Sequence, residues 1–172
     1  MTSPPIPAPP QGTPPGAQQI MRHPRRAIAV ADRAAALGRH PFGAILVGPD
    51  QETVLMEQGN IDTVNHAEST LARIAASNFS SQFLWSCTLY TSAEPCCMCA
   101  GTIYWANIGR LVFGMTETDL LAQTGDHAEN PTMRLASRVV FEHGQKPIEV
   151  IGPVAAIAPE VIAQQKAFWA RR

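Results

Sequence analysis

Two short motifs in this chain bring together residue types that bind a transition metal. One is HAE at residues 66–68 and the other is PCCMC at residues 95–99. Together they supply an imidazole and a pair of thiolates spaced three residues apart. Three protein ligands leave the fourth tetrahedral position of Zn²⁺ open, which is typical of catalytic rather than structural zinc sites. We therefore expect His66, Cys96 and Cys99 to bind one Zn²⁺.

Both motifs are expected where the chain enters a helix. Residues three apart lie on one side of a helix, so the sulfur atoms of Cys96 and Cys99 point the same way. The free N–H groups and the dipole at a helix start favour the thiolate form of both residues. The sequence thus predicts two helix starts that meet at the metal.

A CxxC pair alone is more often half of a structural zinc site or a redox pair. A structural site needs a fourth ligand, but Cys87 is expected within a strand and Cys97 points away from its neighbours on the helix. We interpret both as small buried residues. The other histidines are expected at the surface or in loops, namely His23, His40, His127 and His143.

Glu68 lies two positions after the predicted histidine ligand. A carboxylate at that place can take a proton from an attacking water, pass it to a ring nitrogen and then to a departing amine. The products of such a reaction are ammonia and a carbonyl. The pattern therefore predicts hydrolytic deamination, with Glu68 as the catalytic residue.

Composition limits the classes of protein that fit. The chain has 172 residues, 45% of them hydrophobic, which is enough for one domain with a real core. The net charge of −1 argues against nucleic acid as a partner. We find neither an apolar run of membrane-spanning length nor a signal-peptide pattern, so we expect a cytoplasmic protein without a membrane partner. Residues 1–19 are rich in proline and predict a disordered tail before a domain over residues 20–172.

The apolar patterning predicts alternating strands and helices. Leu71, Ile74 and Ala75 are expected to face inward from the first motif's helix. The last two strands are separated by about 33 residues, and a connection of that length fits a parallel pair better than a hairpin. A three-layer α/β/α sandwich follows. Its strands are expected at residues 42–47, 54–58, 87–92, 110–114 and 148–151, and its helices at 24–37, 66–76, 97–105, within 117–141, and at 160–170.

The stretch Thr91-Ser92-Ala93-Glu94 that leads into PCCMC, with Gly101, Ile103, Tyr104 and Trp105 after it, resembles the cytidine deaminase-like superfamily. The likeness extends over about residues 24–170 and is greatest to the guanine deaminase and bacterial nucleoside deaminase branch. The segment Pro41-Phe42-Gly43-Ala44 also resembles the first strand of that branch. The resemblance implies a five-stranded mixed sheet in the order 2-1-3-4-5 with strands 4 and 5 parallel. It also implies a homodimer that acts on a small molecule.

The resemblance further implies a set of substrate-binding residues. Asn60 matches an asparagine that bonds the base or ribose, and Glu129 matches a glutamate that holds the N–H edge of a purine. Phe42 and Trp105 are candidates to stack on the base, although core packing explains an aromatic residue at either place equally well. Glu129 can also be read as a solvated loop acid. The remaining members are Ala67 and Asp119, and Phe168-Trp169 is a candidate lid.

Several functions remain open at this point. The preferred one is deamination of guanine or a guanine-like heterocycle. A cytosine or cytidine deaminase is an alternative within the same class. A tRNA adenosine deaminase shares both motifs, but the charge of this chain argues against it. A non-enzymatic protein stabilised by zinc is a further alternative, but the carboxylate of Glu68 beside the predicted ligands argues against it.

Overall fold

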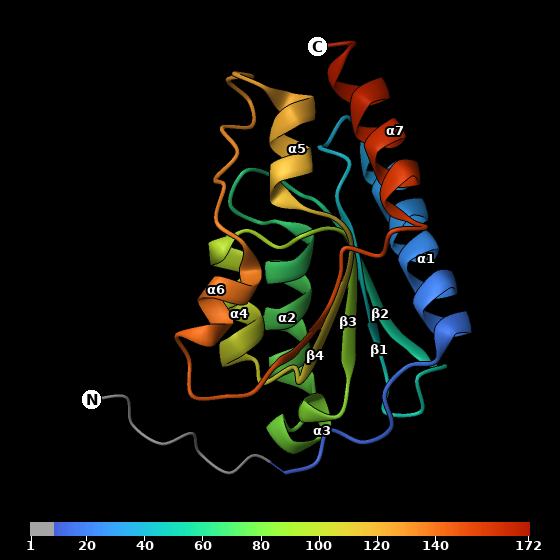
Figure 1. Ribbon diagram of the computed structural model, residues 1–172, viewed down its shortest axis with the longest axis vertical. Helices are drawn as coiled ribbons and strands as arrows, with labels where there is room; N and C mark the ends of the chain where they lie inside the picture. The colour runs from blue at the N-terminus through green and yellow to red at the C-terminus, as the bar shows by residue number, and fades with distance from the viewer. Residues whose placement is uncertain (1–8) are drawn as a thin grey trace.

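The computed structural model describes residues 9–172, which form one mixed five-stranded sheet (Figure 1). The strand order is β2-β1-β3-β4-β5. β1 pairs antiparallel with β2 and β3, whereas the β3–β4 and β4–β5 pairs are parallel. The predicted order and the predicted parallel last pair are both confirmed. The strands are β1 (Gly43–Val47), β2 (Val54–Gly59), β3 (Thr88–Ala93), β4 (Arg110–Met115) and β5 (Glu149–Ile151).

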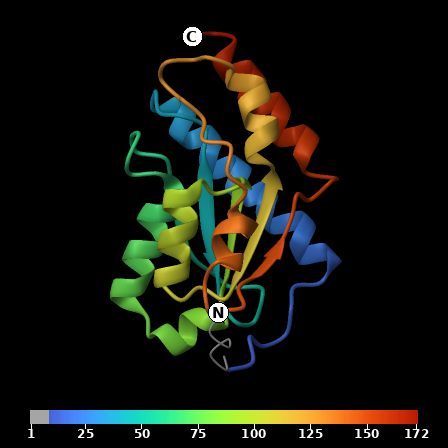
Figure 2. The same ribbon diagram turned by 60° about the vertical axis from the view of Figure 1, so that its left-hand side comes forward.

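Helices cover both faces of this sheet, so the predicted three-layer sandwich is also confirmed. Figures 1 and 2 show α2, α4 and α6 on one face and α1 and α7 on the other, with α5 above the sheet edge beside α7. None of the helices in residues 9–172 is both long and apolar enough to cross a membrane. The helices are α1 (Ala17–Ala36), α2 (Ala67–Asn78), α3 (Ser81–Trp85), α4 (Cys97–Trp105), α5 (Glu117–Thr124), α6 (Ser137–Glu142) and α7 (Ala158–Trp169).

The proline-rich N-terminal stretch is in part packed against the domain. The Gln11 amide donates to the carbonyl of Gly109 at 2.5 Å, and the Trp85 indole donates to the carbonyl of Pro9 at 2.6 Å. Helix α1 begins at Ala17 and includes Pro24. The folded part thus starts earlier than the predicted boundary at residue 20. The rest of the predicted tail, residues 1–8, lies outside the described residues.

Two predicted side-chain positions away from the candidate site are wrong. Ile74, expected to face inward, is 42% exposed, because the buried face of α2 is formed by Leu71, Ala72 and Ala75 and Ile74 lies outside it. His23, expected at the surface, is buried. Its Nε2 lies 2.9 Å from the carbonyl oxygen of Gln51, so a backbone partner satisfies the imidazole inside the protein.

Helix α1 approaches the start of β1 closely because Gly43 has no side chain. A Cβ at this position would lie 2.3 Å from the carbonyl oxygen of Ala27 and 2.5 Å from the nitrogen of Ala31. Both atoms belong to the helix backbone and cannot move independently of the helix. The contact fixes the position of the start of β1 and of Phe42, which directly precedes this strand and lies at the site described below.

We predict that Gly43→Ala destabilises the fold by about 1–3 kcal/mol, the usual effect of overpacking a rigid site. Gly101→Ala is the matched control, because no atom lies within 4 Å of a Cβ there and alanine favours a helix by up to about 1 kcal/mol over glycine. Urea unfolding measures both free energies. Equal stability of the two variants would show that the close approach of α1 does not constrain the sheet.

Candidate active site

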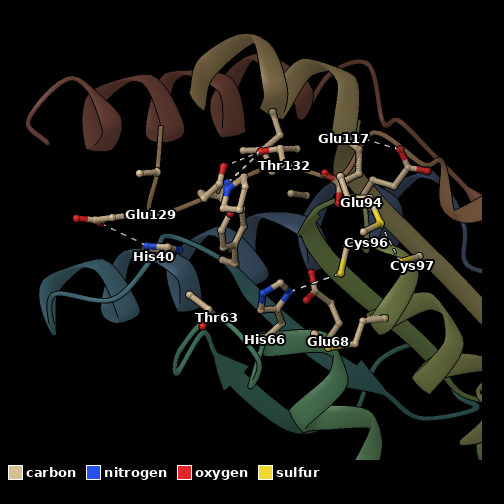
Figure 3. Close-up of a pocket in the computed structure, with 18 residues that line it drawn as sticks. His40, Thr63, His66, Glu68, Glu94, Cys96, Cys97, Glu117, Glu129 and Thr132 are labelled. Carbon is tan, nitrogen blue, oxygen red and sulfur yellow. Dashed lines mark hydrogen bonds and ion pairs between the residues drawn. The ribbon is translucent and has the colours of Figure 1, made fainter. Parts of the chain in front are cut away.

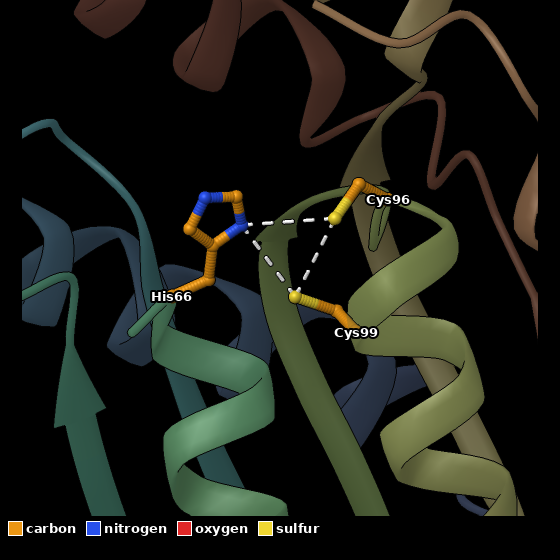
Figure 4. Close-up of side chains that lie close together, drawn as sticks. All are labelled: His66, Cys96 and Cys99. Atoms are coloured by element: carbon orange, nitrogen blue, oxygen red, sulfur yellow. Dashed lines mark hydrogen bonds between the residues drawn. The ribbon is translucent and has the colours of Figure 1, made fainter. Parts of the chain in front are cut away.

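The predicted metal ligands meet at the edge of the sheet where β3 and β4 end. His66 and Cys96 are the residues that directly precede α2 and α4, and Cys99 lies in the first turn of α4. The His66 Nδ1 atom lies 3.7 Å from the Cys96 sulfur and 3.6 Å from the Cys99 sulfur, and the sulfurs are 3.7 Å apart (Figure 4). The two helix starts therefore bring the three donor atoms together as expected.

The three donor atoms fit a zinc ion. Sulfur ligands about 2.3 Å and a nitrogen ligand about 2.0–2.1 Å from one tetrahedral centre lie roughly 3.5–3.8 Å from one another. The observed separations of 3.6 and 3.7 Å agree with that spacing. His66, Cys96 and Cys99 form the metal-binding group of the described residues, with the chemistry that Zn²⁺ prefers.

The electrostatics of the group favour metal binding. The hydrogen bond with Cys99, followed by that with His66, lowers the pKa of Cys96 to about 4, whereas the same bond raises the pKa of Cys99, so without a metal one sulfur is a thiolate and the other keeps its proton. The hydrogen bond with Cys96 raises the pKa of His66 above its usual value. A cation that replaces the shared protons satisfies all three donors at once.

Glu68 lies directly beside the ligands and is buried. One carboxylate oxygen accepts a hydrogen bond of 2.8 Å from the Thr91 hydroxyl, and the other lies 3.5 Å from the Cys99 sulfur. Burial raises the pKa of Glu68, although the nearby His66 opposes the shift. A carboxylate that is oriented by one hydrogen bond and holds protons more readily than usual suits a proton-transfer residue.

A cavity of about 450 Å³ opens above these residues (Figure 3). Its walls come from the first turns of α2, α4 and α5 and from the loop between α5 and α6. Five predicted site residues line it: Phe42, His66, Glu68, Cys96 and Glu129. This size matches pockets that hold small molecules.

Trp105 does not line the cavity. It is 80% exposed at the far end of α4, where it packs against Tyr104 and lies under the ammonium group of Lys146. Nine residues of helix separate it from Cys96, which amounts to about 13 Å. Trp105 is thus far from the cavity of its own chain, and its predicted role in stacking on a base stays a prediction.

Asp119 is also absent from the cavity wall, and a local role explains it. Its carboxylate accepts a hydrogen bond of 2.7 Å from the Thr116 hydroxyl, which in turn accepts from the Asp119 backbone N–H at 3.0 Å. This reciprocal pair caps the start of α5. The structure shows this cap for Asp119, and its predicted contact with substrate stays a prediction.

Asn60 and Ala67 are buried beside the cavity without lining it. The Asn60 amide donates to the carbonyl of Asp62 at 3.2 Å, whereas its Oδ1 atom has no partner among the described residues. Ala67 is a fully buried member of the core. Their predicted contacts with substrate stay predictions.

Glu129 reaches the cavity mouth from the loop after α5, and its side chain is 48% exposed. Its carboxylate accepts a hydrogen bond of 2.6 Å from Arg172 and lies 3.7 Å from the His40 ring. The bond to Arg172 lowers the pKa of Glu129, so the residue is ionised at neutral pH. Its predicted role in binding a purine also stays a prediction.

His40 lines the cavity, which sequence reasoning missed by placing it among the surface histidines. Its ring packs against Trp169 with ring centres 4.9 Å apart and against Phe168 at 6.2 Å. Those two aromatic residues do not line the cavity themselves, so they support His40 and do not cover the pocket. The position of His40 immediately before Pro41-Phe42 was the available signal.

Cys87 is fully buried as predicted, but Cys97 is not. Cys97 is partly exposed, lines the cavity and has its sulfur 3.1 Å from the sulfur of Met133. The first turn of α4 turns the Cys97 side chain toward the loop after α5, whereas Cys96 and Cys99 face the metal group. The expectation of a buried residue is wrong here.

Two further acidic residues, Glu94 and Glu117, line the cavity and received no role from the sequence. Glu94 directly follows the parallel strand β3, and Glu117 comes two residues after the end of β4. The Glu94 carboxylate is buried and accepts bonds of 2.8 Å from both the backbone N–H and the hydroxyl of Ser137. It also accepts a bond of 3.2 Å from the Glu117 N–H, so Glu94 ties α5 and α6 to the end of β3.

Comparisons with known proteins agree with this geometry. Residues 17–115 match the family of the cytidine and deoxycytidylate deaminase zinc-binding region. A probable cytosine deaminase from Schizosaccharomyces pombe is 38% identical over 84% of this chain and 89% of that protein. A tRNA-specific adenosine deaminase from Haemophilus influenzae is 37% identical over 73% of this chain and 76% of that protein.

A solved deaminase structure has a similar fold. The structure of a guanine deaminase from Nitrosomonas europaea superposes with a TM-score of 0.61, covering 95% of this chain and 97% of that chain at 20% identity. At this identity the likeness concerns the fold alone. The sequence match spans both metal-binding motifs and the four strands from β1 to β4. The chain therefore belongs to the zinc-binding cytidine and deoxycytidylate deaminase family.

Proposed function

We infer that this protein is a zinc-dependent hydrolytic deaminase of a small aminated heterocycle. The observation that carries this proposal is a group of three zinc-type ligands beside a buried carboxylate, of which His66, Cys96 and Glu68 line one cavity. His66, Cys96 and Cys99 would hold the ion, and Glu68 is within reach of the same space. The family supports an enzyme that hydrolyses amino groups.

The division of labour follows from the residues. A zinc ion held by His66, Cys96 and Cys99 would lower the pKa of a water molecule and so supply a nucleophile near neutral pH. Glu68 would accept one proton of the attacking water and give it to a ring nitrogen of the heterocycle, and would then take the second proton from the added hydroxyl and give it to the departing amine. Thr91 orients the Glu68 carboxylate through its 2.8 Å hydrogen bond. Ammonia leaves, and a carbonyl stays on the ring.

Guanine or a guanine-like amino-oxo heterocycle is the proposed substrate. The 2-amino group of guanine is the group that leaves and must lie at Glu68, so the ring N–H groups are the donors left for an ionised carboxylate, which accepts hydrogen bonds through two oxygens. Glu129 offers such a carboxylate at the cavity mouth. Binding there requires that the substrate take over the place that Arg172 holds at 2.6 Å.

Cytosine is the second candidate, because the S. pombe relative with that name matches most of the chain. A tRNA adenosine is a third, favoured by the H. influenzae relative. The net charge of −1 gives little electrostatic attraction for the phosphates of RNA. The cavity of about 450 Å³ favours a free base over a polynucleotide.

We also propose that the protein forms a homodimer in the cytoplasm. The outer surface of the layer built from α2, α4 and α6 exposes the large apolar side chains Ile74, Trp105 and Val139. Apolar groups on one such face are common where copies of a chain associate. Four free cysteines agree with a reducing compartment.

Removal of one ligand tests the zinc site. We expect Cys96→Ala to lose zinc and activity together and to unfold at lower temperature, since part of the binding free energy of a metal is folding energy. The adjacent Cys97→Ala is the matched control and is expected to keep one zinc per chain. Elemental analysis and thermal unfolding measure both effects. Stoichiometric zinc in Cys96→Ala would remove this residue from the ligand set.

Glu68→Gln tests the proton-transfer step without changing the size of the side chain. Zinc and substrate binding are expected to persist, because the carboxylate is not among the ligands. Turnover should fall by at least ~10²–10⁴, the usual effect of one positioned acid–base group. Steady-state kinetics with metal analysis on the same samples is the measurement, and Glu142→Gln on the surface is the control. A near-wild-type kcat in Glu68→Gln would rule out the proposed step.

Glu129→Gln tests the choice of substrate. One carboxylate oxygen becomes an N–H donor that opposes the donors of guanine, so we expect kcat/KM for guanine to fall by about tenfold or more relative to cytosine. Asp126→Asn, an exposed acid in the same loop that does not line the cavity, serves as the control. Parallel losses on both substrates would show that Glu129 does not select the base.

A further inference from the structure

Glu117 has a carboxyl group that the mechanism above does not use. It is the first residue of α5, lines the cavity and is only 5% exposed. Its backbone N–H donates to Glu94 at 3.2 Å, but among the described residues no hydrogen bond reaches its carboxylate oxygens. Figure 3 shows it on the α5 side of the cavity, across from His66 and Glu68.

The surroundings make this position unfavourable for the protein alone. Burial raises the pKa of Glu117 to about 8, and the nearby negative charges of Cys96, Glu68 and Glu94 add to the shift. The Glu117 oxygens are not among the sealed-off buried atoms, and the residue lines the cavity, so a ligand there can reach its carboxyl group. The helix dipole favours an acid in the first turn of α5 but does not require that acid to line the cavity.

The backbone that carries Glu117 is held firmly. Glu94 bonds the N–H of Glu117 with one oxygen and Ser137 with the other, and the parallel register places Ala93 beside Met115. The ends of β3 and β4 therefore fix where the Glu117 side chain starts. A rigid position of this kind suits a group that must meet a ligand in one orientation.

The other cavity acids already have tasks or partners. Glu68 bonds Thr91 and lies beside the metal ligands. Glu94 is saturated by backbone and hydroxyl donors, and Glu129 is bound to Arg172 at the exposed mouth. Glu117 is thus the buried acid of the cavity with free hydrogen-bonding capacity.

We propose that Glu117 is a specificity-determining residue whose carboxyl group hydrogen-bonds a ring N–H or exocyclic amine of the heterocycle in the cavity. The inference rests on the proposed function and adds a second recognition point inside the pocket, opposite the reacting group. A heterocycle with an N–H donor on the side facing α5 satisfies this carboxyl group. An analogue that is methylated at that nitrogen leaves it unpaired and is rejected.

The test combines binding, kinetics and stability in zinc-loaded protein. Glu117→Gln keeps the size of the side chain, Glu117→Leu removes its polarity, and Glu142→Gln is a surface control. Calorimetry with 2,6-diaminopurine gives Kd, ammonia release from guanine gives kcat and KM, and thermal unfolding without ligand gives Tm. Leaving a buried N–H donor of the ligand unsatisfied costs about 1–3 kcal/mol, so we expect Kd and KM to rise about fivefold or more in Glu117→Leu.

The stability readout separates recognition from a structural role. Relief of an unpaired buried carboxyl should leave the Tm of Glu117→Leu unchanged or raise it, with zinc retained, while binding weakens. A lower Tm with Kd and KM within twofold of wild type would overturn the proposal and make Glu117 a structural residue. If Glu117→Leu fails to fold, the same criteria apply to Glu117→Gln.

The calorimetric arm does not depend on turnover. Wild-type protein that binds the purine but releases no ammonia would contradict the proposed function, and the ratio of Kd values between wild type and Glu117→Leu would still decide the role of Glu117. Wild-type protein that binds no aminated heterocycle would overturn both proposals.

Discussion

The convergence of two helix starts on one edge of the sheet is the constraint on which the rest of this site depends. His66 and Cys96 cap α2 and α4, and Cys99 follows within one turn, so the three donor atoms are set by backbone geometry and not by long flexible side chains. The helix dipoles favour thiolate at the same place. Parallel pairing of β3 with β4 then brings the next loop, and with it α5, over the metal group.

That arrangement brings several carboxylates into one small cavity, and each of them has a different environment. Glu94 accepts hydrogen bonds from Ser137 and from the start of α5, whereas Glu68 is buried and oriented by Thr91. Glu129 stays solvated and paired at the mouth. A divalent cation at the ligand group compensates part of this charge, so metal binding and the protonation of the acids are coupled. The proposed role of Glu117 follows the same principle, since a carboxyl group without a protein partner lowers the stability of the fold but is available to bind a ligand.

Sequence reasoning predicted what depends on local spacing. The ligands, the helix starts and the parallel last strands follow from periodicity, the i, i+3 rule and the length of the connection before β5. Glu94 and Glu117 escaped because their meeting depends on the register of β3 against β4, although an acid after each parallel strand was a usable signal. The distance of Trp105 from the cavity of its own chain was not predictable, because closeness in sequence to the CxxC pair does not say which end of a nine-residue helix faces the cavity. The proline-rich composition of residues 1–19 predicted a disordered tail, and composition alone could not predict the hydrogen bond from Gln11 to Gly109.

Ammonia release by the zinc-loaded wild-type protein, measured side by side on guanine, cytosine, adenosine and a tRNA anticodon stem, tests the central claim most directly. The account predicts one ammonia per carbonyl product, with the highest kcat/KM on guanine or a guanine-like base and a loss of activity when a chelator removes the metal. A preference for cytosine or RNA would contradict the substrate choice and leave the reaction type intact. Stoichiometric zinc with no ammonia from any aminated heterocycle would contradict the assignment of this cavity to hydrolytic deamination.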